Sequence, residues 1–103
     1  MQHILDLLSK CTGFEWDAGN IDKNWISHQV HWFEAEQAII NRPIALTDDY
    51  KHSDIESRYI ALGSTNVNRL LSVVFTIRRD KVRVISARDM DIEEKRQYYE
   101  EAA

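Results

Sequence analysis

Two arginines in one short stretch could together bind an anion. Arg78 ends a run of β-favouring residues that begins at residue 69, and Arg83 lies in a second such run that ends at Arg88. If a two-residue turn joins the runs into a β-hairpin, Arg78 and Arg83 project from the same face of the sheet. Like charges on adjacent strands destabilise a sheet unless an anion lies between them. That anion is either a carboxylate of this protein or a phosphate of a ligand.

The hairpin over residues 69–88 is the element that must position these arginines. Side chains of a strand point alternately to opposite faces. The first arm should therefore present an apolar face made of Leu71, Val73, Phe75 and Ile77. On the second arm, the residues predicted to join this apolar face are Val82, Val84 and Ser86. The residues predicted to lie beside Arg78 are Arg83, Ile85 and Ala87. The same alternation predicts that Arg88 projects from the core side.

A histidine outside the hairpin could transfer a proton. His28 is predicted to lie near the C-terminus of a helix over residues 18–28, where the helix dipole favours a charged imidazole. It could donate a proton or contact a phosphate; alternatively, it packs beside Trp25 and bonds a carbonyl group. His31 and Glu34 follow at spacings of three, but the turn between two predicted helices breaks their shared face. We therefore expect no metal site and no cofactor.

The other predicted elements alternate between helices and strands. Amphipathic patterns predict helices at residues 3–11 and 32–40, and Asp91 and Glu94 have the spacing of a capping box before a C-terminal helix. Strands are predicted at residues 44–49 and 58–62, with a polar loop at 50–57 and a turn at 63–68. An extended segment at 14–17 ends in Asp17, which could cap the following helix. This order predicts an α+β fold, with an antiparallel sheet of about four strands packed against helices.

The composition is typical of one globular domain without a disulfide framework. The chain has 103 residues, of which 44% are hydrophobic and 29% charged, and Cys11 is its one cysteine. No apolar run approaches the length that spans a bilayer, and the first residues lack the basic segment and cleavage site of a signal peptide. We therefore expect a single domain over residues 1–103 in the cytoplasm, with no membrane association.

Charge is distributed unevenly along the chain. The net charge of −4 argues against a protein that coats nucleic acid indiscriminately. Residues 1–60 carry 5 basic and 10 acidic side chains, whereas residues 61–96 carry 8 basic and 5 acidic side chains. The hairpin is therefore a basic patch, which is compatible with binding one phosphodiester at a defined place.

A series of short motifs, in their order and spacing, resembles a known family. The motifs are Phe-Glu-Trp-Asp at residues 14–17, Asn24, His28, Val30, Glu34-Ala35, Pro43, Arg58, Leu62-Gly63, Arg78, Val84-Ile85-Ser86-Ala87-Arg88 and Glu94-Lys95-Arg96-Gln97-Tyr98. Together they resemble the BrnT family of type II toxins, which are ribonucleases with a RelE-like α+β fold, encoded with a BrnA antitoxin. The resemblance covers residues 14–101 and leaves residues 1–13 as an N-terminal helical extension.

The resemblance implies a function and its partners. The chain would be an endoribonuclease toxin that cleaves RNA, inhibits growth and is neutralised by a BrnA-like antitoxin. The two proteins would form a hetero-oligomer, and operator DNA would be bound only through the antitoxin. The alternative is a non-catalytic module that binds an acidic segment of a protein partner, or a regulator that binds its operator together with a partner.

The resemblance also implies a role for each candidate residue. RelE-like ribonucleases need no metal, because a base activates the ribose 2′-hydroxyl, cations stabilise the charge on the phosphate and an acid assists the leaving 5′-oxygen. Arg78 and Arg88 would stabilise that charge, since a guanidinium binds two phosphate oxygens and keeps its proton. His28 would be the acid or base. The residues expected to contact the RNA backbone are Lys23, Arg58 and Arg83.

Overall fold

The computed structural model describes residues 1–52 and 55–103 and has a five-stranded sheet at its centre. In the order β1-β5-β4-β3-β2, the strands are Gly13–Phe14 (β1), Lys81–Asp89 (β5), Leu70–Arg78 (β4), Tyr59–Ser64 (β3) and Ala45–Asp48 (β2). The helices among these residues are Gln2–Ser9 (α1), Lys23–His28 (α2), Trp32–Ile40 (α3) and Ile92–Glu101 (α4), with a 3-10 turn at Tyr50–His52 (η1). The α+β prediction is confirmed. The strand beyond the expected four is β1, which pairs in parallel with β5.

Strands β4 and β5 form the predicted hairpin. Arg78 pairs with Lys81 across a two-residue turn, in which Arg79 and Asp80 have φ angles of 50° and 66°. Two successive left-handed residues are typical of a type I′ turn, whose twist matches that of the paired strands. The two-residue turn assumed from the sequence is therefore confirmed, although neither position holds the Gly or Asn that such turns favour.

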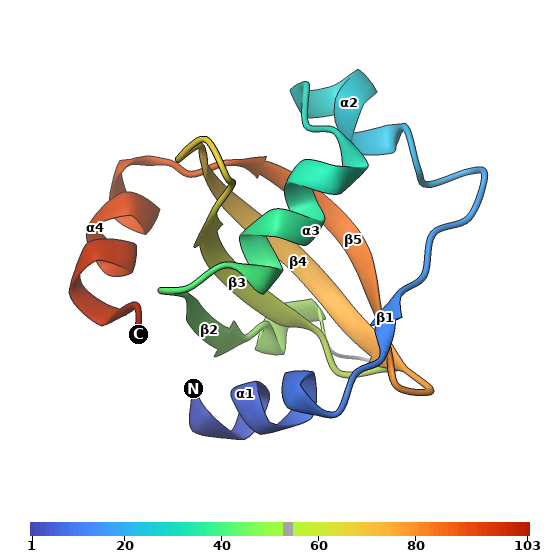
Figure 1. The fold of residues 1–103 in the computed structure, drawn as a ribbon, viewed down its shortest axis with the longest axis horizontal. Coiled ribbons are helices and arrows are strands. Elements are labelled where there is room, and N and C mark those ends of the chain that lie inside the picture. The colour runs from blue at the N-terminus through green and yellow to red at the C-terminus, as the bar shows by residue number, and fades with distance from the viewer. Residues whose placement is uncertain (53–54) are drawn as a thin grey trace.

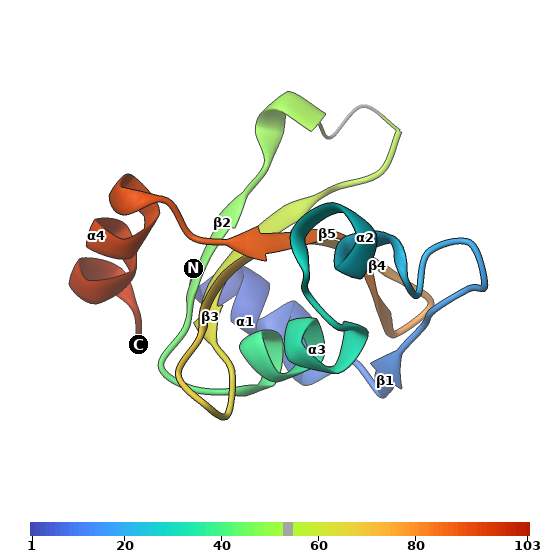
Figure 2. The same ribbon diagram turned by 90° about the horizontal axis from the view of Figure 1, so that it is seen from above.

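The apolar face of β4 is the main core of the protein. Leu71, Val73 and Phe75 are fully buried, as the alternation in the sequence predicts. Helices α1 and α3 lie on this side of the sheet (Figures 1 and 2). The close approach of α3 depends on Gly63 in β3, because a Cβ atom at that position would lie 2.0 Å from the carbonyl oxygen of Ala38.

A bulge changes which residues of β5 share a face. Val74 pairs with Ser86 but Phe75 pairs with Val84, so Ile85 is an extra residue and the alternation shifts by one. Before the bulge, the predicted faces agree with the strand pairing. After it, the predictions for Ser86, Ala87 and Arg88 were wrong. Ala87 is buried in the core, whereas Ser86 and Arg88 pair with Val74 and Ser72 and therefore project on the side of Arg78.

Most of the predicted elements are present, with shifted ends. Helix α3 has the predicted bounds. Helix α4 begins directly after Asp91, the N-cap of the predicted capping box, whose carboxylate accepts from the Glu94 amide at 2.8 Å. The helix expected from residue 18 begins only at Lys23, and Asp17 does not cap it, because the Asp17 carboxylate pairs with Arg83 instead. The expected polar loop contains η1, and its residues 53–54 lie outside the described residues.

Helix α4 covers only part of the second face of the sheet. Tyr98 and Met90 pack with Ala45 and Leu62 of β2 and β3, and the Tyr98 hydroxyl donates to the Pro43 carbonyl at 3.1 Å. Among the described residues, no α-helix lies over the half of this face that belongs to β4 and β5 (Figure 2). In the part of the chain that the structure describes, no helix is both long and apolar enough to cross a membrane.

Candidate functional site

The uncovered half of the second face carries a groove lined with arginines. Three adjoining hollows, of about 440, 420 and 340 Å³, lie along it, and Arg58 lines all three. Arg78 lines the two larger hollows, Arg83 lines the largest and Arg88 the smallest. The segment that contains η1 rises on this side of the sheet, opposite α1 and α3 (Figure 2). We call the three hollows together the arginine groove.

Strand register explains why the cations gather here. Arg83 pairs with Thr76, two residues before Arg78 on β4, so both arginines share a face. The bulge at Ile85 turns Arg88 to the same side. Thr76 also donates its hydroxyl to the carbonyl of Ser57 at 2.7 Å, which holds the segment leading to Arg58 against β4. The tertiary structure thus brings together four arginines from three strands or their immediate ends.

In this structure, Arg78, Arg83 and Arg88 of the hairpin each pair with a carboxylate of the protein. Arg78 donates from Nε and Nη2 to the two carboxylate oxygens of Glu56, at 2.9 and 3.0 Å. Arg88 donates from Nη1 and Nη2 to those of Glu94, at 2.7 and 3.0 Å. Arg83 pairs with Glu15 and Asp17. Of the two anions that the sequence left open, the free chain therefore supplies its own carboxylates.

These ion pairs determine the protonation states of the carboxylates in the groove. The hydrogen bond from Arg78 lowers the pKa of Glu56, and the pKa of Arg78 is raised in return. Burial alone would raise the pKa of Glu94, but the hydrogen bonds from Arg88 and from the Asp91 amide outweigh it and the pKa is lowered. Both carboxylates therefore stay ionised at neutral pH and are poor proton donors.

The segment that leads into α2 holds the edge of β5 at the bulge. Strand β1 pairs with only two residues of β5, so the edge beyond them needs other hydrogen-bond partners. Asn20 donates to the Val84 carbonyl and Lys23 Nζ to the Ile85 carbonyl, both at 2.8 Å, while the Asn24 side chain accepts from the Ala87 amide at 3.0 Å. Lys23 thus lines the largest hollow with its ammonium group bonded to the bulge.

His28 is not among the residues that line the arginine groove. It is the last residue of α2, and its carbonyl group lies 3.5 Å from Nη2 of Arg69, which also binds Asp89 and Glu34. Trp25 stacks on His31 rather than on His28, with ring centroids 4.1 Å apart. The structure therefore brings Lys23, Arg58, Arg78, Arg83 and Arg88 together and leaves His28 apart from them.

A different histidine lines the groove, and the sequence reasoning placed it only in a polar loop. His52 lines two of the hollows, in both cases with Arg58. Its Nδ1 lies 3.1 Å from both carboxylate oxygens of Asp49. The spacing of Asp49 and His52, three residues apart and shortly before Arg58, is a signal that could have identified the pair. Among the described residues, no group of three or more His, Cys, Asp or Glu side chains is placed to hold a metal ion.

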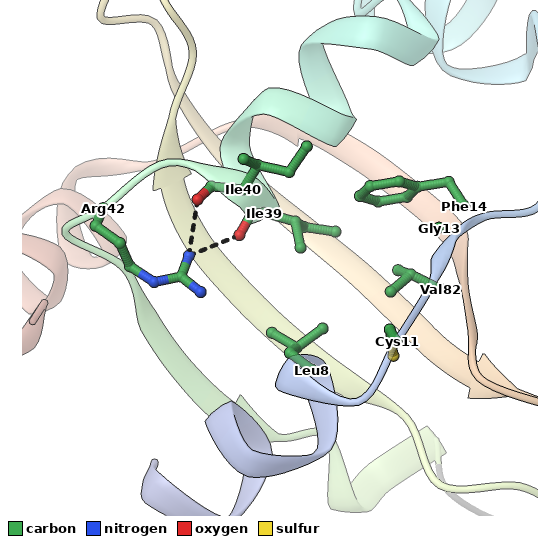
Figure 3. Close-up of a pocket in the computed structure, with 8 residues that line it drawn as sticks. All are labelled: Leu8, Cys11, Gly13, Phe14, Ile39, Ile40, Arg42 and Val82. Atoms are coloured by element: carbon green, nitrogen blue, oxygen red, sulfur yellow. Dashed lines mark hydrogen bonds between the residues drawn. The ribbon is translucent and has the colours of Figure 1, made fainter.

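A further hollow, of about 310 Å³, lies on the covered side of the sheet and is mostly apolar (Figure 3). Leu8, Ile39 and Val82 line it, and the Arg42 guanidinium is bonded to the Ile39 and Ile40 carbonyl groups. Burial, followed by the charge of Asp80, raises the pKa of the Cys11 thiol at its edge, so this sulfur is a weak nucleophile. The charged groups suited to phosphate chemistry are those of the arginine groove.

The chain matches one family model, over residues 16–94, and the model is described as "Ribonuclease toxin, BrnT, of type II toxin-antitoxin system". No curated protein matches the chain. The matched range contains every residue that lines the arginine groove and ends within α4. Helix α1 and strand β1 lie outside it.

Proposed function

Since the chain belongs to the BrnT family of ribonuclease toxins of type II toxin-antitoxin systems, we propose that it cleaves RNA in the arginine groove without a metal ion. Membership of the family implies an RNA target and an antitoxin partner. The observation that supports the groove as the site is the convergence of Arg58, Arg78 and Arg88 on adjoining hollows of one face. Guanidinium groups around a hollow can hold a phosphodiester by its non-bridging oxygens.

In the proposed reaction, the ribose 2′-hydroxyl attacks the neighbouring phosphorus and the 5′-oxygen leaves. Arg78 and Arg88 stabilise the negative charge that builds up on the phosphate oxygens. Each of them already binds a pair of carboxylate oxygens, and two phosphate oxygens present a similar target. Arg78 is half exposed, and exposed ion pairs are weak, so exchange of Glu56 for a phosphate costs little.

The other candidate residues keep the roles proposed for them. Lys23, Arg58 and Arg83 contact the RNA backbone, and all three line the largest hollow. The acid or base role of His28 stays a prediction, and the position of His28 outside the groove makes it the least supported of these roles. We also propose that the chain acts in the cytoplasm, where its RNA target is available.

The antitoxin that we propose is BrnA-like and forms a hetero-oligomer with the toxin. Glu56 and Glu94 occupy the guanidinium groups of the free chain, so an acidic segment of the partner could bind the groove in the same way. Such a segment would exclude RNA from the site. In this scheme operator DNA is bound only through the antitoxin.

Incubation of the purified chain with RNA tests the proposal. We expect cleavage that persists in EDTA and leaves products with a 2′,3′-cyclic phosphate. Expression of the chain alone should arrest growth, and co-expression of the antitoxin should restore it. Intact RNA together with a tightly bound antitoxin would favour the alternative, a non-catalytic interaction module.

A further inference from the structure

We propose that Asp49 and His52 form the proton-transfer pair of the arginine groove, with His52 as the base that accepts the proton of the ribose 2′-hydroxyl. This inference rests on the proposed function and adds to it a catalytic residue and a positioning residue. Neither the match to the family nor the pattern of the sequence assigns a role to these two residues.

The geometry of the pair defines which ring nitrogen is available. Asp49 accepts from His52 Nδ1, at 3.1 Å from each carboxylate oxygen, so the neutral ring carries its proton on Nδ1. The described residues offer no hydrogen-bond partner to Nε2, and the His52 side chain is 64% exposed, against 12% for Asp49. A sheltered carboxylate behind an accessible imidazole is the arrangement that fixes the tautomer of a catalytic base.

The backbone holds the pair at the end of the sheet. The Asp49 amide donates to the Arg58 carbonyl at 2.9 Å, which extends the pairing of β2 with β3 by one step. The His52 amide donates to the Asp49 carbonyl at 3.2 Å within η1. The position of His52 relative to Arg58 therefore depends on regular backbone hydrogen bonds and not on its side chain alone.

His52 shares a hollow with each of the two arginines that stabilise the reacting phosphate in the proposed function. It lines one hollow with Arg58 and Arg78, and a second hollow with Arg58 and Arg88. A phosphate bound in either of these two hollows would therefore share it with the imidazole. A base acts only when it lies within hydrogen-bond reach of the proton it accepts, so a base must line the hollow in which the phosphate is bound.

The other titratable groups near the phosphate are less suited to this step. Glu56 and Glu94 have lowered pKa values because Arg78 and Arg88 hold their carboxylates, and a carboxylate of low pKa is a weak base. An imidazole titrates near neutral pH, where a general base is most effective. The charged groups that face His52 are Asp49 from its own segment and Glu56, Arg58, Arg78 and Arg88 across the two hollows.

The proposed step is balanced without any co-reactant other than water. His52 Nε2 takes the proton from O2′ as the O2′–P bond forms, and the P–O5′ bond breaks with its electron pair on O5′. Water gives a proton to O5′, and the resulting hydroxide receives the proton of the imidazolium. The products are a 2′,3′-cyclic phosphate and a 5′-hydroxyl, with the enzyme restored.

Matched histidine variants test this role. His52→Gln should lower the rate of RNA cleavage about 100-fold or more, because that is the usual contribution of a general base. The control is His3→Gln, the same change at an exposed position on α1, on the opposite side of the sheet, and it should leave the rate unchanged. Thermal unfolding and binding of an uncleavable 2′-deoxy oligonucleotide should be the same for both variants and the wild type.

The kinetic constants test the role of Asp49 as a positioning residue. Asp49→Asn should lower kcat for RNA cleavage about tenfold or more, because an amide no longer selects the ring that carries its proton on Nδ1. KM should stay close to the wild-type value, because the arginines of the groove still bind the phosphate. A purely structural role for Asp49 would lower the melting temperature and leave kcat of the folded protein unchanged.

The outcomes separate this inference from the proposed function. If the wild type leaves RNA intact, the proposed function fails and the inference fails with it. If the wild type cleaves RNA and the folded His52→Gln variant cleaves it within threefold of the wild-type rate, only the inference is overturned. A large loss in His28→Gln with none in His52→Gln would assign the proton transfer to His28 instead.

Discussion

The two faces of the hairpin differ although the same two strands form both of them. On one face, Leu71, Val73 and Phe75 are fully buried on the side of α1 and α3. On the other face, Arg78 and Arg88 are about half exposed, and each donates two hydrogen bonds to one carboxylate. The residues that stabilise the fold and the residues of the proposed reaction therefore lie on opposite sides of one sheet. Substitutions on the two faces should therefore have separable effects, and each prediction below tests that separation.

The largest effect is expected on the covered face. Phe75→Ala should lower the free energy of unfolding by about 3–5 kcal/mol, because it removes a fully buried ring and leaves a cavity. Chemical denaturation measures the loss, and Val67→Ala, at a largely exposed apolar position, is the control. A loss under about 1 kcal/mol would place the ring outside the core. The remaining folded protein should cleave RNA at the wild-type rate.

On the groove face, a substitution is expected to lower the activity and leave the stability unchanged. Arg78→Ala should reduce the rate of RNA cleavage about 100-fold or more, because removing a hydrogen-bond donor to the charge of the transition state has an effect of this size in other enzymes. The melting temperature should stay close to the wild-type value, because the ion pair of Arg78 with Glu56 is exposed. Arg96→Ala is the matched control, since Arg96 is an exposed arginine of α4 with carboxylate partners of its own. A large fall in melting temperature with unchanged specific activity would contradict the catalytic role.

A smaller loss of stability is expected where α3 approaches the sheet. Gly63→Ala should destabilise the protein by about 1–3 kcal/mol, because the added Cβ atom collides with the Ala38 carbonyl group and forces the backbone apart. Gly19→Ala is the control, as its Cβ atom would meet nothing nearer than 3.6 Å. Equal unfolding curves for the two variants would show that α3 can move away from β3 without a loss of stability.

The smallest effect concerns acid stability at the end of β5. The hydrogen bond from Arg69 lowers the pKa of Asp89 below its ordinary value. A lowered folded-state pKa contributes stability above the unfolded-state pKa, and this contribution is lost as the pH falls through the folded-state value. Arg69→Met should therefore flatten the decline of the melting temperature below about pH 4. If the melting temperature of the variant falls with pH as steeply as that of the wild type, the Arg69–Asp89 pair does not contribute to stability. The rate of RNA cleavage at neutral pH, which should be unchanged, is the control.

Local patterns were enough to predict much of the fold. Alternation over residues 71–77 identified the covered face, and the spacing of Asp91 and Glu94 identified the start of α4. Both signals depend on residues within a few positions of each other, so the sequence contains them without knowledge of the tertiary structure. The motifs that resemble the BrnT family were likewise sufficient to predict the family that the comparison confirmed.

The composition of the groove depended on pairing between distant segments. The bulge at Ile85 depends on how β5 aligns with β4, and only this alignment brings Arg88 to the side of Arg78. Asp17 had the features of a helix cap, but Arg83 comes close to it only in the folded chain. His52 lies in a segment that the sequence indicated only as a loop, where no periodicity gives the direction of a side chain. Its place beside Arg58 was decided by the pairing of β2 with β3. The sequence by itself therefore determined the covered face, whereas only the tertiary structure decided which charged groups meet on the other face.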